Sequence, residues 1–169
     1  MTANEVVNLL KKNEVSPIEL LAALETRVNE IDKDVNALPT RCFSRAKSEA
    51  EKLMQKPLEE RGVLAGLPIA IKDLTPVQGV KSTWGSPVYK DFVPKRSDCL
   101  VENVEKEGAI VYAKSNTPEF GAGANTFNEV FGATLNPWDT SKSCAGSSGG
   151  SAVALATGQA WIASGSDLG

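Results

Sequence analysis

Apolar residues recur at helical spacing through the amino-terminal part of the chain. Thr2 and Glu5 form the pattern of a capping box ahead of a short helix, and Ser16 with Pro17 repeats this start signal more strongly. A third helix is predicted over Ser44 to Met54. Behind Pro17 runs one apolar stripe, made of Leu20, Leu21, Leu24, Val28 and Ile31. Such a stripe predicts packing against a core.

The first strand signal is the segment Leu67 to Lys72, which alternates between two faces. One face carries Leu67, Ile69 and Ile71, and the other carries Pro68, Ala70 and Lys72. Alternation over this length is typical of a β-strand. Lys72 therefore ends a face of small residues, and Asp73 follows it directly.

Helices and strands continue to alternate along the rest of the chain. The pattern predicts a helix over Ser97 to Glu107, a strand over Ala109 to Ala113, a short helix from Thr117, a helix from about Gly150 to Thr157, and a strand over Gln159 to Ser164. Residues 121–151 show no firm period, and a connection of that length is usually functional. The order of elements indicates an α/β fold with a largely buried sheet, and we find no internal repeat or domain boundary.

Composition is that of an ordinary globular domain. The chain has 169 residues, of which 41% are hydrophobic and 23% charged, and this length suffices for one domain with a core. A net charge of −3 without a block of like charge argues against a nucleic-acid partner. No apolar run approaches the roughly 18 residues of a membrane span. We expect a cytoplasmic protein with reduced cysteines and no membrane partner.

The chain contains no histidine. This excludes Ser-His-Asp and Cys-His chemistry and most transition-metal sites from the sequence given. Any general base must be Lys, Asp, Glu or Tyr. We expect neither a metal nor a cofactor.

A glycine- and serine-rich run over Ser143 to Ser151 passes directly into an apolar helix. A flexible linker is a poor explanation, because linkers do not run into packing segments. A phosphate cradle would need the Gly-Lys-Ser/Thr ending of a P-loop, which is missing. Gly146 to Gly150 matches the G-x-S-x-G nucleophile elbow around Ser148, but a turn sequence precedes it in place of a strand. The remaining interpretation is a lysine base that acts through serines.

Three blocks in order carry a resemblance to a known family: residues 66–73, 145–152 and 165–169, with supporting pieces at 108–111, 114–120 and 131–139. This arrangement resembles the amidase signature family of hydrolases. The resemblance implies a mixed central sheet covered by helices on both faces. It also implies that residues 1–169 are a single incomplete domain, the amino-terminal part, which stops just before the expected nucleophilic serine.

The family's Ser-Ser-Lys triad assigns roles to individual residues. Lys72 matches the triad lysine, which is the base, and Ser147 matches the bridging serine, whose preceding peptide bond is cis in the family. The resemblance places the attacking serine just past Gly169 and the oxyanion hole at the backbone N–H groups of Leu168 and Gly169. Supporting roles, structural or catalytic, are expected for three further residues, Ser148, Ser151 and Asp167.

Two positions next to this triad raise questions of their own. Asp73 is placed to steady Lys72, although a buried carboxylate there would raise the pKa of the lysine, which is the wrong direction for a base. Ala145 stands where the family usually has glycine. Its methyl group strains the loop if the local φ is positive.

The resemblance implies hydrolysis of a carboxylic amide C–N bond. Glutaminase subunits that make amidated transfer RNA usually read Met-Asp-Glu-Phe where this chain reads Thr117-Pro118-Glu119-Phe120, which favours a general amidase. A different alternative is an inactive fragment that needs the rest of the domain or a partner. The expected ligand is a small-molecule amide, and a homodimer is compatible with the sequence.

Overall fold

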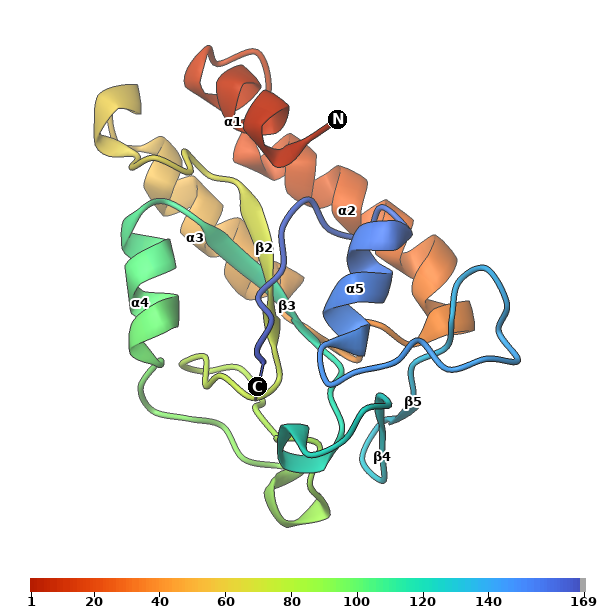
Figure 1. Cartoon of the computed structure of the whole chain (residues 1–169). Coiled ribbons are helices and arrows are strands. Elements are labelled where there is room, and N and C mark those ends of the chain that lie inside the picture. The colour runs from red at the N-terminus through yellow and green to blue at the C-terminus, as the bar shows by residue number, and fades with distance from the viewer. Residues whose placement is uncertain (168–169) are drawn as a thin grey trace.

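A small mixed sheet lies at the centre of the molecule (Figure 1). The computed structural model describes residues 1–167. Within them the sheet has the order β1-β3-β2, with β1 at Thr40–Arg41, β2 at Pro68–Lys72 and β3 at Ile110–Ser115. β2 runs parallel to β3, and β1 runs antiparallel to it. Every residue of β2 and β3 is buried, as expected for a sheet covered on both faces.

The three amino-terminal helices begin and end close to the predicted residues. They are α1 (Ala3–Lys11), α2 (Pro17–Val35) and α3 (Phe43–Met54). Both predicted capping boxes are present, since Thr2 and Ser16 each exchange hydrogen bonds with the glutamate three residues later. The chain leaves α2 through Asn36, which adopts a left-handed conformation with φ 52°.

Helices cover both faces of the sheet, and Figure 1 shows α4 (Cys99–Lys106) and α5 (Gly149–Ala156) on opposite sides of it. On one face α2, α3 and α5 pack over Ala70 and Tyr112. On the other face Val101 of α4 packs with Ile69 and Ile71. The predicted alternation of side chains between the two faces of β2 is therefore confirmed, with the larger side chains on the α4 side.

The strand predicted over Gln159 to Ser164 is wrong for most of its length. Only Ala163 forms a bridge, parallel to Ala70. The N–H groups of Gln159 and Ala160 instead donate to the carbonyl of Ala154, so the chain first closes the end of α5. Only the residues after this closure run beside β2.

The long segment after β3 is held by short elements rather than by regular structure. A two-stranded hairpin joins β4 (Phe127–Asn128) to β5 (Gly132–Ala133). The short helix predicted from Thr117 is a single 3-10 turn, Glu119–Gly121, because Phe120 inside it takes φ 52°. Two further 3-10 turns lie at Leu58–Glu60 and Pro87–Tyr89. Over residues 1–167, no helix is both long enough and apolar enough to cross a membrane.

Candidate active site

The carboxyl end of β2 and the amino-terminal end of α5 meet at one edge of the sheet, and Lys72 is the last residue of β2. Its side chain is only 1% exposed. The Lys72 Nζ lies 2.7 Å from Ser147 Oγ, 3.0 Å from Ser148 Oγ and 2.8 Å from Ser166 Oγ. The structure thus surrounds the amine with three hydroxyl groups.

Burial lowers the pKa of Lys72 from the ordinary lysine value of 10.5. The cause is desolvation, which disfavours the ammonium form. The partners of the amine are neutral hydroxyls rather than carboxylates, so they do not oppose this shift with a charge. A buried amine among hydroxyls is suited to accept a proton.

Two serines hold the backbone around Lys72 without touching its amine. The Lys72 N–H donates to Ser164 Oγ at 2.8 Å. Ser151, in the first turn of α5, donates to the carbonyl of Ser164 at 2.7 Å, and its Oγ lies 2.6 Å from Ser115 Oγ of β3. Ser151 therefore ties α5, β3 and the carboxyl-terminal segment together.

The loop before α5 brings Ser147 to the amine through unusual backbone. The Gly146–Ser147 peptide bond is cis. Ala145 has φ 61°, so its methyl group stands in a left-handed conformation, and the strain expected of a non-glycine residue there is present. Thr126 stabilises the loop, since its Oγ1 donates to the Ala145 carbonyl at 2.9 Å and accepts from the Gly149 N–H at 3.0 Å.

Glycines at the start of α5 permit a close approach of backbones. A Cβ added at Gly149 would lie 2.2 Å from Thr126 Oγ1, and one at Gly150 would lie 2.3 Å from the backbone nitrogen of Asn116. Neither position has room for a side chain. The glycine-rich run is therefore required for packing as well as for presenting the serines.

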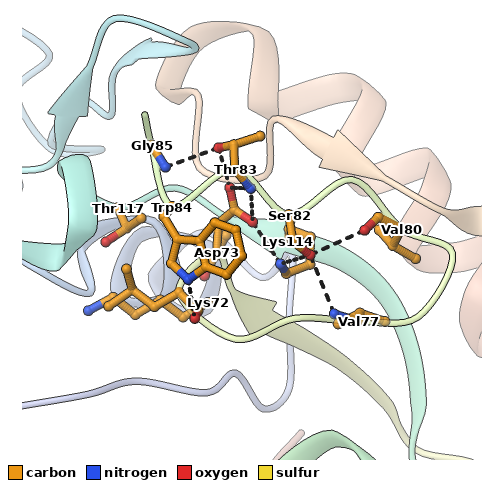
Figure 2. Close-up of polar contacts among 12 residues, drawn as sticks. Lys72, Asp73, Val77, Val80, Ser82, Thr83, Trp84, Gly85, Lys114 and Thr117 are labelled. Atoms are coloured by element: carbon orange, nitrogen blue, oxygen red, sulfur yellow. Dashed lines mark hydrogen bonds and ion pairs between the residues drawn. The ribbon is translucent and has the colours of Figure 1, made fainter. Parts of the chain in front are cut away.

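Asp73 does not bind Lys72, contrary to the role suggested from the sequence. Its carboxylate accepts from Lys114 Nζ of β3 at 2.7 Å, and Figure 2 shows the Lys72 amine pointing away from it. Adjacent residues at the end of a strand direct their side chains to opposite sides, which explains the separation. The aspartate is part of a second polar cluster.

An open cleft of about 910 Å³ leads to the serines. Its lining includes Ser147, Ser148, Ser166 and Asp167, and the small residues Gly121 and Ala152. Three of the predicted residues, Lys72, Ser147 and Ser148, are thus in contact at this cleft, and Asp167 lies at its wall. The predicted oxyanion-hole residues Leu168 and Gly169 lie outside the described residues.

Sequence reasoning missed the contacts of Ser164 and Ser166 with Lys72. Both residues lie in the last block that carries the resemblance or directly before it, and their hydroxyls were the available signal. A serine between a glycine and an aspartate is also a common turn residue, and so the pattern by itself did not distinguish a ligand of the lysine from a turn.

Known proteins with similar sequences and folds are consistent with this geometry. A protein-family model described as Amidase matches residues 19–169. One subunit of the glutamyl-tRNA(Gln) amidotransferase of Thermoanaerobacter pseudethanolicus is 39% identical over the whole chain, which covers 35% of that relative. The chain therefore spans about a third of the length of this relative.

Two solved structures show the same fold. A bacterial aryl acylamidase of the amidase signature family superposes with a TM-score of 0.86 at 30% identity, over 95% of this chain and 34% of the other. A fatty acid amide hydrolase superposes with a TM-score of 0.92 at 23% identity, over 99% of this chain and 30% of the other, which shows the fold alone. The family model matches most of the length of the chain. Together with the fold, this match shows that the chain belongs to the amidase signature family.

Proposed function

We propose that the protein of which this chain forms part hydrolyses a carboxylic amide, with Lys72 as the base and Ser147 as the bridging serine. The observation that carries the proposal is the 2.7 Å contact between the buried Lys72 amine and Ser147 Oγ. Membership of a family of amide-hydrolysing enzymes supports the reaction class.

Proton accounting at the amine supports the direction of transfer. A neutral lysine has two N–H donors and one lone pair, but Lys72 has three hydroxyl partners. At least one hydroxyl must therefore donate to the amine once it is neutral. We assign the donor role to Ser147, because it matches the bridging serine of the family pattern and lies 2.7 Å from the amine.

The proposed reaction uses this one base twice. The Lys72 amine takes the proton of Ser147, Ser147 takes the proton of the attacking serine, and that serine's oxygen bonds to the amide carbon. The proton then returns through Ser147 to the amine that leaves when the C–N bond breaks. Water releases the acyl group by the same relay. By the family pattern the attacking serine lies past Gly169, and the backbone N–H groups of Leu168 and Gly169 would stabilise the oxyanion.

A second candidate function is the glutaminase activity of an amidotransferase, because the relative at 39% identity carries the name of such an enzyme. Against it, Thr117 and Pro118 stand where glutaminase subunits usually have Met and Asp. A comparison of glutamine with neutral anilides as substrates of the full-length protein separates the two. Faster turnover of the anilides supports the general amidase, and efficient turnover of glutamine supports the glutaminase.

Labelling with an alkyl fluorophosphonate tests the proposed roles without knowledge of the substrate. In the full-length protein we expect the label on a serine that follows Asp167, found by peptide mapping. Label on Ser147 or Ser148 would contradict the assignment of a bridging role. We further propose that the 169 residues alone hydrolyse no amide, because the resemblance places the attacking serine past them.

A further inference from the structure

A buried ion pair lies directly beside the candidate base and takes no part in the proton relay. Lys114 Nζ of β3 donates to Asp73 Oδ1 at 2.7 Å, and the two side chains are 0% and 1% exposed. Thr83 adds hydrogen bonds from its N–H and its Oγ1 to the same carboxylate, and Ser82 Oγ accepts from the lysine at 2.9 Å. Figure 2 shows these contacts, and the low exposure of both side chains leaves neither charge open to water.

Such a pair is costly to bury and is therefore weak evidence of a contribution to stability. The desolvation penalty of two buried ions often exceeds their attraction. Burial lowers the pKa of Lys114, and the charge of Asp73 opposes that shift. The position of the pair next to Lys72 suggests another reason for its presence.

The carboxylate alone would disturb the base. Asp73 follows Lys72 in the chain, and in a buried region of low dielectric a charge acts over longer distances than in water. An uncompensated negative charge there would favour the ammonium form of Lys72 and oppose the effect of its burial. Lys114, on the neighbouring strand, supplies the compensating positive charge.

We propose that Lys114 is a positioning residue of the reaction: it neutralises and holds Asp73, so that the end of β2 is fixed by this carboxylate without its charge acting on the Lys72 amine. The carboxylate is needed because it binds Thr83. Next to Thr83, the Trp84 N–H donates to the backbone carbonyl of Asp73. This inference rests on the proposed function, in which Lys72 is the base.

Three charged groups of the described residues adjoin Lys72 in the chain, on the neighbouring strand or at the cleft. They are Asp73 after β2, Lys114 on β3 and Asp167 at the wall of the cleft. The loop before α5 presents the hydroxyls of Ser147 and Ser148. Asp167 is left unchanged in the experiment below, so it cannot account for a difference between the variants.

The test compares two variants of the full-length protein that differ in a single charge. Both carry Lys114→Met, and the second adds Asp73→Asn, which keeps the shape of Asp73. The readout is the second-order rate constant of labelling by a neutral alkyl fluorophosphonate as a function of pH. If the Lys114→Met variant does not fold, Lys114→Gln, alone and combined with Asp73→Asn, gives the same comparison.

The labelling rate falls at low pH, and this part of the pH–rate profile is its acid limb. We expect the acid limb of Lys114→Met to lie about half a pH unit or more above that of the double variant with Asp73→Asn. At a pH on this limb its labelling is then about threefold slower. Lys114→Arg, which keeps the charge, should retain the wild-type limb. If the single and double variants share one acid limb, the proposal is overturned, because Lys114 is then only structural.

The proposed function fails in a distinguishable way. If the Lys72→Met variant is labelled at the same rate as the wild-type protein, Lys72 is not the base, and both proposals are overturned. If Lys72→Met loses labelling as expected, but the Lys114→Met variant and the double variant share one acid limb in their pH–rate profiles, only the second proposal is overturned.

Discussion

Lys72 at the end of β2 and Ser147 before α5 are 75 positions apart in the sequence, and their side chains meet at 2.7 Å. The strand fixes the lysine, and packing of the glycines at the start of α5 fixes the serine. The end of β2 and the loop before α5 therefore bring the two residues together at the carboxyl-terminal end of β2. The expected effects of substitution follow from this arrangement.

In the proposed relay, replacement of Ser147 by alanine removes the bridge between Lys72 and the attacking serine. We expect kcat/KM for a neutral amide to fall about 10²- to 10⁴-fold in the full-length protein, the range for loss of a proton-transfer group. Ser148→Ala is the matched control, since Ser148 also contacts Lys72, but at 3.0 Å. Its loss should stay within about tenfold, because the relay does not pass through it. An equal loss in both variants would argue against Ser147 as the bridge.

Ser166 is expected to position the amine rather than to carry the proton. Its Oγ lies 2.8 Å from Lys72 Nζ, so Ser166→Ala removes one of three contacts that orient the side chain. We expect kcat to fall about tenfold with KM little changed, and Ser166→Thr to restore most of kcat because it keeps the hydroxyl. Steady-state kinetics of the two variants provide the check, and a threonine variant as slow as the alanine variant would refute the hydroxyl's role.

Ala145 offers a stabilising substitution. The left-handed conformation costs a non-glycine residue about 1–2 kcal/mol, and glycine costs about 0.5–1 kcal/mol in lost chain entropy. Ala145→Gly should therefore raise the free energy of unfolding, by up to about 1.5 kcal/mol. Ala152→Gly, inside α5, is the control and should lower it by about 1 kcal/mol. Urea denaturation measures both, and destabilisation by Ala145→Gly would show that the loop is not strained at this residue.

The pH dependence of the reaction follows from the direction of the Lys72 shift. Burial lowers the pKa of Lys72 below 10.5, so the amine becomes neutral at a lower pH than an exposed lysine does. In the proposed mechanism Lys72 acts as a base above this pKa, and the activity is lost as the pH falls through it. We expect the kcat/KM profile to show an acid limb that lies below the ordinary lysine range. A limb at the ordinary lysine value would mean that the amine is not desolvated in the working enzyme.

Local signals predicted most of the fold. Capping residues located α1 and α2, and alternation located β2, because both depend on neighbours in the sequence. The strand after α5 was mostly wrong, because the Ala154 carbonyl takes the N–H groups that a strand would have used.

Contacts across long separations limited the prediction of the site. Lys72 and Ser147 were found through motif order, but the partner of Asp73 was not, because Lys114 is 41 positions away and nothing local selects it over Lys72. Ser166, at 94 positions from Lys72, was missed for the same reason. The number of hydroxyls around the amine is set by the packing of three segments.

The most direct test of the account is the fluorophosphonate labelling rate of Lys72→Met in the full-length protein. Methionine keeps the apolar stem in its buried site and removes only the amine, so the fold is expected to persist by circular dichroism. The account predicts labelling slowed by about 10²- to 10⁴-fold, because no group remains to take the serine proton. Labelling at the wild-type rate in a folded variant would contradict it.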